Sequence, residues 1–574
     1  MSHAQDFWGQ LTQFTQQFQK LMAANPSMGQ LPQMPTLPGM PPIFGASPVQ
    51  GLNFDPVKLQ SLQQQYLKEA TDLWQQALSA QTPAVGDRRF SGDAWQQNPL
   101  ASFAAATYLL NTRTLMEMAE AVEGDGKTKA RLRFAVEQWA AASAPSNFLA
   151  FNAEAQKKAI DTKGESIAKG LQNLLEDMQK GSVSMTDESH FEVGKNVATS
   201  EGAVVFENEF FQLIEYKPLT AKVYEKPFLL VPPCINKFYI LDLQPDNSFI
   251  RYAVAQGHHT FVVSWRNPDA SMSTKTWDNY IEQAAIKAIH TVQEITGAEQ
   301  INALGFCVGG TILGTALAVL AARGDDAVAS ATFLTTLLDF TDTGVLDVFI
   351  DENFVKFREM EMGQGGLMKG RDLASTFSFL RPNDLVWNYV VGNYLKGETP
   401  PPFDLLYWNG DSTNLPGPFY AWYLRNTYLE NNLIKPGKVT VCGEKIDLSK
   451  VKIPVYIYGS REDHIVPIGG AYASTQVLPG KKRFVMGASG HIAGVINPAS
   501  KNKRSHWLRA DGKLPATQAE WLAGAKELPG SWWTDWSDWL KAQAGKQIAA
   551  PKAYGKGKFK AIEAAPGRYV KQKA

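Results

Sequence analysis

The chain has 574 residues, of which 44% are hydrophobic and 20% charged, with 56 basic and 56 acidic side chains. This length allows two or more domains with a large buried core. The balanced charge gives no support for nucleic acid as a partner. The three cysteines, Cys234, Cys307 and Cys442, are widely spaced and fit neither a disulfide framework nor a zinc site. They predict a reducing, cytoplasmic setting.

Residues 1–190 are expected to form a separate, mainly helical region. From Phe7 to Met22, aromatic and apolar residues recur among glutamines at near-helical spacing, which predicts an amphipathic helix. Residues 26–50 contain seven prolines and have the composition of a linker. Apolar stripes among Ala, Gln, Leu and Glu then return from about residue 56 to 178 and predict further helices. The first residues do not resemble a secretory signal.

Residues 191–574 change to short β-like runs, several of which are separated by helical stretches such as Asp278–Thr296 and Thr311–Ala322. Strands that alternate with helices predict a mostly parallel sheet covered on both faces, an α/β fold. The predicted strands are Ala203–Phe206, Phe210–Tyr216, Phe228–Val231, Thr260–Ser264, Ile301–Phe306, Ala329–Thr336, Val455–Tyr458 and Arg483–Met486.

Between about residues 342 and 440 the alternation stops and aromatic residues accumulate. We interpret this stretch as an insertion that caps the sheet, because ligand sites favour enclosed apolar places. Ordinary core positions of a large domain would account for many of the same aromatics taken singly. They are Phe349, Phe354, Phe357, Phe377, Phe379, Trp387, Tyr389, Tyr394, Phe403, Trp408, Phe419, Tyr420, Trp422 and Tyr423.

Two further segments have more than one interpretation. Gln300–Ala322 runs for 23 residues without a charge, the length of a membrane span. A buried strand followed by a buried helix has the same composition, and we favour that interpretation over a span. Residues 551–574 hold seven Lys or Arg and one acid, Glu563. We expect them to form a solvated, mobile tail, although a basic patch is the alternative.

The pentad Gly305-Phe306-Cys307-Val308-Gly309 has the G-x-C-x-G pattern of a nucleophile elbow. In such an elbow the nucleophile occupies a sharp, strained turn from strand to helix, and flanking glycines avoid collisions with both elements. Cysteine stands here where serine is usual. We therefore predict that Cys307 is a nucleophile, whereas a lone cysteine after glycine is more often a small buried hydrophobe.

A cysteine nucleophile needs a base and a group that orients the base. Asp463 follows a β run in Y-G-S-R-E-D-H-I-V-P, and His491 follows the next strand in G-A-S-G-H. Nucleophile, acid and histidine thus occur in the order of the α/β-hydrolases. We predict that Cys307, Asp463 and His491 form a triad. His464 is the alternative base, whereas the remaining histidines lack such a context.

The oxyanion of an acyl transfer requires two backbone N–H donors, one of them from the residue after the nucleophile, Val308. The second is expected from the loop Val231–Asn236, whose prolines have no N–H to donate. Cys234, Ile235 and Asn236 remain as donors, and we favour Ile235. A second nucleophile at Cys234 is the alternative role for that residue.

The sulfur of Cys307 also narrows the reaction. Acyl transfer from a thioester to a thiolate is nearly isoenergetic, so Cys307 can accept an acyl group from a CoA thioester and keep it activated. A serine would hold it as a lower-energy oxyester. The cysteine thus favours an acyltransferase that uses thioesters over a simple lipase.

Several motifs resemble the polyhydroxyalkanoate synthases. They are P-P-C-I-N-K-F-Y-I-L-D-L at 232–243, G-F-C-V-G-G at 305–310, N-D-L-V-W-N-Y-V-V at 383–391, W-N-G-D-S-T-N-L-P-G-P at 408–418, Y-G-S-R-E-D-H-I-V-P at 458–467, G-A-S-G-H-I-A-G-V-I-N-P at 487–498 and K-N-K-R-S-H-W at 501–507. The resemblance covers essentially residues 190–574. It implies an α/β-hydrolase fold with a cap and the polymerisation of (R)-3-hydroxyacyl-CoA to polyester with release of CoA. It also implies a nucleophile at Cys307, an acid at Asp463 and a histidine at His491.

G-F-C-V-G-G and the alanine after His491-Ile492 look like class I synthases, which imply short substrates such as 3-hydroxybutyryl-CoA. The resemblance further implies a homodimer on the surface of cytoplasmic polyester granules, with the N-terminal region linked to dimer stability and to granule or phasin association. It implies neither cofactor nor metal. Arg381, in L-R-P-N-D, is our candidate for a CoA contact, and a surface ion pair is its alternative role.

Two other functions compete with the synthase. A cytoplasmic thioesterase or polyester depolymerase would use the same fold and triad, but it would admit water to the acyl group. A granule coat or scaffold protein would use only the amphipathic helix from Phe7 to Met22. The triad argues against such a scaffold as the sole role.

Overall fold

The computed structural model describes residues 53–79 and 81–574, so the predicted helix at Phe7–Met22 and the proline-rich segment 26–50 lie outside the described residues. The chain divides into two compact units. The first extends to Asp187 and also includes Ser375–Pro402, and the second comprises Glu188–Ala374 and Phe403–Ala574.

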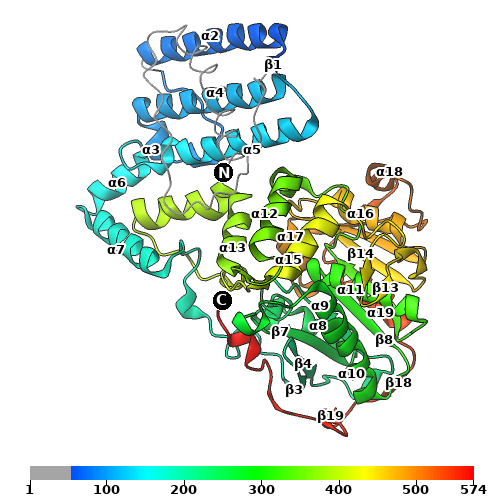
Figure 1. The fold of residues 1–574 in the computed structure, drawn as a ribbon. Coiled ribbons are helices and arrows are strands. Elements are labelled where there is room, and N and C mark those ends of the chain that lie inside the picture. The colour runs from blue at the N-terminus through cyan, green and yellow to red at the C-terminus, as the bar shows by residue number, and fades with distance from the viewer. Residues whose placement is uncertain (1–52, 80) are drawn as a thin grey trace. The chain divides into compact units, whose positions relative to one another are not determined.

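The first unit is mainly helical. Figure 1 shows three of its helices lying side by side, and Tyr66, Met118 and Leu132 from these helices share a buried core. The side chain of Asp55 caps the helix that begins at Pro56, and that of Asn98 caps the helix that begins at Pro99. Each accepts backbone N–H groups of the first turn, and each cap is followed by a proline. The elements up to Asp187 are β1 (Asn53–Phe54), α2 (Pro56–Leu78), α3 (Asp93–Gln96), α4 (Pro99–Ala121), β2 (Val122–Glu123), α5 (Gly126–Ser143), α6 (Ala153–Asp161) and α7 (Glu165–Lys180).

The segment Ser375–Pro402 belongs to this helical unit, whereas the sequence placed it in the cap of the catalytic domain. Polar contacts attach it there. The Tyr394 hydroxyl donates to Asp177 Oδ2 at 2.7 Å, and Asn173 Nδ2 donates to the Asn393 carbonyl at 2.9 Å. Lys158 pairs with Glu398 at 2.7 Å. Sequence patterns miss such contacts because each joins residues more than 200 positions apart in the chain.

In the described residues of the second unit, an eleven-stranded mixed sheet forms the centre. The spatial order is β17 (Lys526–Pro529), β16 (Ser505–Leu508), β15 (Lys482–Gly487), β14 (Val455–Ser460), β9 (Val328–Leu334), β8 (Ile301–Phe306), β6 (Phe228–Val231), β7 (Thr260–Trp265), β4 (Phe211–Tyr216), β3 (Gly202–Glu207) and β21 (Glu563–Ala564). The middle strands, from β15 to β7, run parallel, and both edges are antiparallel.

The α-helices of the second unit pack around the large sheet (Figure 1). They are α8 (Phe249–Ala255), α9 (Trp277–Tyr280), α10 (Lys287–Thr296), α11 (Val308–Arg323), α12 (Glu352–Met362), α13 (Gly370–Phe379, which crosses the unit boundary), α14 (Asp404–Asn409), α15 (Gly417–Tyr423), α16 (Ile468–Val477), α17 (His491–Val495), α18 (Gln518–Ala523) and α19 (Trp533–Gln543). Small two-stranded sheets pair β5 (Lys222–Tyr224) with β18 (Gln547–Ala549), β10 (Leu367–Met368) with β11 (Leu415–Pro416), β12 (Thr440–Val441) with β13 (Glu444–Lys445), and β19 (Gly555–Lys556) with β20 (Phe559–Lys560).

Helices and separate cores cover both faces of the large sheet. Side chains of one strand alternate between the two cores, with Ile301 and Ala303 in one and Leu304 and Phe306 in the other. Residues of α10, α11 and α16 pack in the first core, and residues of α8 and α19 pack in the second. Both faces are therefore apolar, as expected of a parallel sheet.

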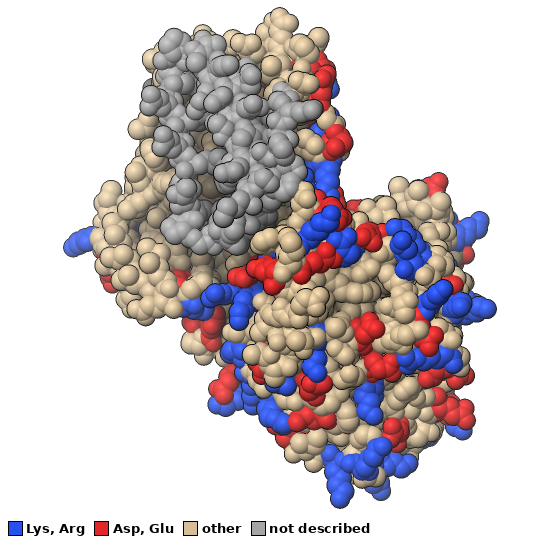
Figure 2. All heavy atoms as spheres, viewed as in Figure 1, with Lys and Arg blue, Asp and Glu red and all other residues tan. Residues whose placement is uncertain are grey.

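The fold confirms the predicted α/β class and the helical region before it. The charge-free stretch Gln300–Ala322 consists of the buried strand β8 and the buried helix α11. Among residues 53–79 and 81–574, no helix is both long and apolar enough to cross a membrane. On the face of the second unit seen in Figure 2, acidic and basic side chains are interspersed over much of the surface, and several basic side chains lie together at the lower end of the view.

The prediction of a solvated, mobile tail at residues 551–574 is wrong. Strand β21 pairs with β3, and Tyr569 and Val570 are buried. The Arg568 guanidinium pairs with Glu207 and Glu563. The strands here are only two residues long, so they carry no periodic pattern that sequence analysis could detect.

Candidate active site

Cys307 sits at the turn between β8 and α11 in a strained backbone conformation, with φ 52° and ψ −127°. A non-glycine residue at positive φ costs on the order of 1–3 kcal/mol and persists only where its surroundings enforce it. Here the Cys307 N–H donates to the Leu334 carbonyl on β9 at 3.0 Å. A side chain at Gly309 would collide with the carbonyl oxygens of Val231 and Pro232, and one at Gly305 with the backbone of Gly310. The two glycines thus let strand, elbow and helix approach closely.

Asp463 lies in the loop after β14, and His491 is the first residue of α17, which follows β15; the two side chains meet in a buried pair. His491 Nδ1 lies 2.6 Å from Asp463 Oδ2. The other oxygen, Oδ1, accepts the backbone N–H groups of Ile465 at 2.8 Å and Val466 at 2.9 Å. The carboxylate is therefore fixed by its own loop and aligns the imidazole. With Nδ1–H directed at Asp463, Nε2 is the nitrogen available for the thiol.

The electrostatics of His491 link it to the nucleophile as well as to the acid. Burial lowers the pKa of His491, but the charges of Asp463 and Cys307 and hydrogen bonds to both side chains outweigh it, so that its pKa is raised to about 10. A proton on His491 is thus stabilised by the Asp463 carboxylate on one side and by Cys307 on the other. A histidine that holds a proton in this way suits the base that a cysteine nucleophile needs.

The predicted oxyanion donors lie on elements that contact each other. Val308 is the first residue of α11, and the close approach of Gly309 to Val231 and Pro232 packs that first turn against the loop that contains Ile235. The Ile235 carbonyl accepts the Thr413 N–H at 3.0 Å, and Trp265 Nε1 donates to the Pro232 carbonyl at 2.9 Å. Both ends of the loop are therefore anchored.

The buried thiol of Cys234 lies in the same loop. Burial raises the pKa of Cys234, and the nearby charge of Cys307 raises it further. A buried thiol that resists ionisation is a poor nucleophile. These electrostatics favour a packing role for Cys234.

The other predicted residues lie elsewhere. Asp463 pairs with His491, the histidine that we favoured as the base. Arg381 belongs to the helical unit, and its CoA contact stays a prediction. Most of the remaining histidines have local partners: His259 binds Glu215, His290 binds Asp325 and His506 lies near the Gly530 carbonyl. Within residues 53–79 and 81–574, no group of three or more His, Cys, Asp or Glu side chains could hold a metal.

Two cap tyrosines near the nucleophile were not singled out from the sequence. The rings of Tyr423 and Tyr428 meet edge to face at 5.6 Å, and their hydroxyls hydrogen-bond to each other. Burial raises the pKa of Tyr428, and the charge of Cys307 adds to the effect. Both rings and Cys307 remain partly exposed, whereas His491 and Asp463 are buried. The aromatic richness of the cap was the only sequence signal, and it did not distinguish these two residues.

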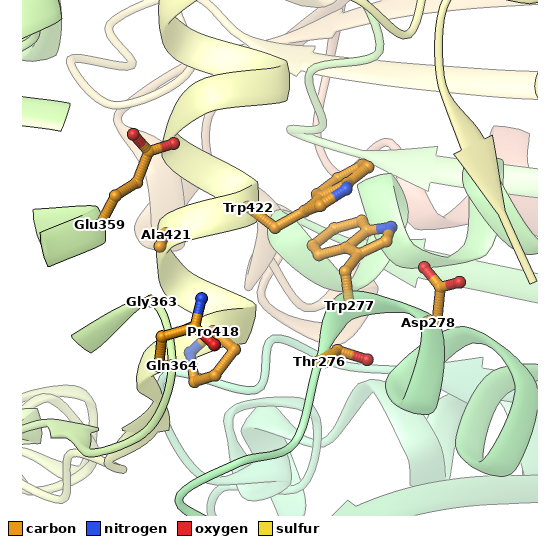
Figure 3. Close-up of a pocket in the computed structure, with 9 residues that line it drawn as sticks. All are labelled: Thr276, Trp277, Asp278, Glu359, Gly363, Gln364, Pro418, Ala421 and Trp422. Carbon is orange, nitrogen blue, oxygen red and sulfur yellow. The ribbon is translucent and has the colours of Figure 1, made fainter. Parts of the chain in front are cut away.

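A pocket of about 530 Å³ has aromatic rings among its lining residues (Figure 3). The rings of Trp277 and Trp422 stack at 4.7 Å in its wall, and Trp277 also stacks on Tyr423 at 5.5 Å. These contacts join Trp422, Trp277, Tyr423 and Tyr428 in one run of rings, which we call the aromatic wall. The lining residues are Thr276, Trp277, Asp278, Glu359, Gly363, Gln364, Pro418, Ala421 and Trp422.

Comparisons with known proteins agree with this fold. A family model described as the N-terminus of poly-beta-hydroxybutyrate polymerase (PhaC) matches residues 86–253, and an alpha/beta hydrolase fold model matches residues 227–498. The chain is 61% identical to the poly(3-hydroxyalkanoate) polymerase subunit PhaC of Cupriavidus necator, over 91% of this chain and 90% of that protein.

More distant relatives give the same result. The subunit PhaC of Rhizobium meliloti is 39% identical over 91% of this chain and 87% of its own length. The poly(3-hydroxyalkanoate) polymerase of Methylorubrum extorquens is 40% identical over 91% and 88%. The chain thus belongs to the poly(3-hydroxyalkanoate) polymerases, acyltransferases built on an α/β-hydrolase fold.

Proposed function

We propose that the protein polymerises (R)-3-hydroxyacyl-CoA into polyester with release of CoA, through an acyl group held on Cys307. One observation supports the proposal: Cys307 occupies a strained elbow, and the charge of Cys307 helps to raise the pKa of His491, which Asp463 holds at 2.6 Å. We infer that His491 takes the proton of Cys307 and so generates the reactive thiolate. A thiolate exchanges acyl groups with a thioester at little cost in free energy and so keeps the chain activated for growth.

In the proposed first step, the Cys307 thiolate attacks the thioester carbonyl while His491 holds the proton. The tetrahedral oxyanion lies on the N–H groups of Val308 and Ile235. When the intermediate collapses, the carbon–sulfur bond to CoA breaks and His491 Nε2 gives its proton to the leaving thiolate. The acyl group is then bound to Cys307 as a new thioester.

In the second step the 3-hydroxyl of another hydroxyacyl unit attacks the acyl group on Cys307. An ester bond forms, the carbon–sulfur bond to Cys307 breaks so that the cysteine leaves as a thiolate, and a base must take the hydroxyl proton. The surroundings of Asp463 favour His491 for this role, because one carboxylate oxygen accepts two backbone N–H groups and the other binds His491. Asp463 then acts by orienting the imidazole. The alternative is direct proton removal by Asp463.

The resemblance to class I synthases favours 3-hydroxybutyryl-CoA as the preferred monomer. For the same reason we propose a homodimer at the surface of cytoplasmic polyester granules, with phasins as further partners. No cofactor enters the proposed steps, since the CoA thioester is itself a substrate. The rings of Tyr423 and Tyr428 support a site that excludes water, which an acyl thioester needs for survival.

Incubation with 3-hydroxybutyryl-CoA tests the proposal when free thiol and turbidity are followed together. A synthase releases CoA and forms insoluble polyester, whereas a thioesterase or depolymerase leaves soluble 3-hydroxybutyrate. Mass spectrometry of the quenched protein should find the acyl group on the peptide that contains Cys307. Cys307→Ala should abolish both CoA release and polymer, and polymer from that variant would refute the assignment.

A further inference from the structure

Three segments of the second unit meet around the buried carboxylate of Asp411. Tyr239, just after the predicted oxyanion loop, donates its hydroxyl to Asp411 Oδ2 at 2.9 Å. Lys573, in the C-terminal tail, places its ammonium 3.0 Å from Asp411 Oδ1. The Asp411 side chain is 2% exposed and that of Lys573 is 66% exposed, so the lysine forms an ion pair from the surface with a buried carboxylate.

The tail also satisfies a second buried charge. Lys237, two residues after Ile235, is buried and donates from Nζ to the Gln572 carbonyl. Burial lowers the pKa of Lys237 to about 8, although the charge of Asp411 opposes the effect. The tail carbonyl therefore solvates an ammonium that water does not reach.

The same segments fix the loop that contains Ile235. Trp408 Nε1 donates to the Lys237 carbonyl at 2.7 Å. Two residues after Asp411, the Thr413 N–H donates to the Ile235 carbonyl at 3.0 Å, and Asn236 pairs with Ser412. A displacement of residues 411–413 would thus move the backbone of Ile235 directly.

Asn267 closes the connection between the tail and this loop. Its Nδ2 donates to the Lys573 carbonyl at 2.7 Å, and its Oδ1 accepts the Asn414 N–H at 3.0 Å. Lys573 is therefore held at its backbone by Asn267 and at its ammonium by Asp411. The tail thus contacts Asp411 directly and Asn414 through Asn267, and these two residues flank Thr413 in the sequence.

We propose that the C-terminal residues Gln572 and Lys573, together with Asp411, are positioning residues for acyl transfer: they hold the loop of Ile235 so that its N–H faces the oxyanion formed at Cys307. The inference rests on the proposed function, because it assigns Ile235 a role in that reaction. None of these groups touches the reacting atoms, and they act through the loop.

The expected effect follows from what such a donor contributes. Removal of one oxyanion donor costs about 10²–10³ in kcat, and a misplacement of about 1 Å can cost about 10². Attack of Cys307 on iodoacetamide forms no oxyanion, so it depends on the thiolate and His491 but not on the loop. The two reactions therefore separate the placement of the loop from the state of the nucleophile.

The test compares the wild type with a variant that lacks residues 572–574 and with Asp411→Asn. Asparagine retains the shape of the side chain but removes its charge. Deletion of Ala574 alone is the matched control, because it leaves Gln572 and Lys573 in place. For each protein we would measure kcat for CoA release from 3-hydroxybutyryl-CoA, the alkylation rate of Cys307 by iodoacetamide, and the thermal unfolding midpoint.

We expect the longer deletion and Asp411→Asn to lower kcat by about 10–100-fold, while alkylation stays within about twofold of the wild type. The control should match the wild type in all three measurements. Wild-type kcat in both variants would overturn the inference, as would a parallel fall in alkylation, since the effect would then reach the triad or the whole fold. Failure of the proposed function is distinct, because the wild type itself would then release no CoA or form only soluble hydroxyacid.

Discussion

Asp463→Asn isolates the charge of the acid from its shape. In the wild type, Oδ1 accepts two loop N–H groups and Oδ2 faces His491 Nδ1 at 2.6 Å. Asparagine can still accept the loop N–H groups through its carbonyl oxygen, so the loop should keep its form. Its amide group would then face Nδ1 and would favour the tautomer with the proton on Nε2. That tautomer cannot accept the proton of Cys307.

The magnitude follows from what the variant loses. The wrong tautomer and the missing charge should lower kcat for CoA release by about 10³–10⁴, equivalent to about 4–5.5 kcal/mol of transition-state stabilisation. The variant should also change the pH dependence of Cys307 alkylation. The charge of Asp463 helps to raise the pKa of His491 to about 10, so wild-type alkylation should vary little between pH 7 and 9. Without that charge the imidazolium loses its proton at lower pH, and alkylation at pH 7 should become slow and rise with pH.

Stopped assays of CoA release and iodoacetamide kinetics between pH 6 and 9 would measure both effects. His464→Ala is the matched control, because it changes the neighbouring residue and removes the alternative base. We expect it to keep kcat within about fivefold of the wild type. The interpretation of the triad would be refuted if Asp463→Asn retained wild-type kcat, or if His464→Ala produced the larger loss.

Four further predictions follow from the geometry. Gly309→Ala should destabilise the catalytic unit by about 1–3 kcal/mol in urea unfolding and impair CoA release, because the added Cβ would collide with two backbone carbonyls. The control Gly126→Ala, whose added Cβ meets no neighbouring atom, should be neutral or stabilising. Cys234→Ala should keep kcat within about threefold of the wild type. A loss of activity as large as that of Cys307→Ala would instead support the alternative role of Cys234 as a second nucleophile. Trp422→Ala should increase the fraction of soluble 3-hydroxybutyrate by admitting water, and an unchanged product ratio would count against the aromatic wall. The pKa of His491 is raised from 6.5 to about 10 in the folded protein, so protonation of His491 stabilises the fold fully below pH 6.5. This stabilisation is lost as the pH rises towards 10. The urea midpoints of wild type and His491→Gln should therefore converge over that range.

The central strands could be predicted from the sequence because residues typical of a turn follow the last position of the strand. Strand β6 ends before two prolines and β8 ends at the elbow, and both coincide with their predicted bounds. The prediction for β9 ran on to Thr336, whereas the strand ends at Leu334. The chain turns at Thr335, which adopts a φ of 39°. An apolar run of threonines and leucines does not reveal such a turn, because tertiary packing imposes it.

The site was predictable where residue order along the chain carried the signal. The glycines around Cys307 and the placement of Asp463 and His491 at strand ends reflect constraints local to each motif. Tyr423, Tyr428 and Asp411 carry no such local signal. Their positions depend on how the cap folds back over the sheet, and the contacts of Asp411 with Tyr239 and Lys573 each join residues more than 150 positions apart.

The membership of residues 375–402 in the helical unit limits how the protein can be divided. A fragment that begins near residue 188 would contain Tyr394 and Asn393 but not Asp177 and Asn173, their hydrogen-bonding partners. The Tyr394 hydroxyl and the Asn393 carbonyl would then lose these hydrogen-bonding partners. Chimeras between relatives should therefore exchange residues 375–402 together with the N-terminal helices, since two separate stretches of the chain form one structural unit.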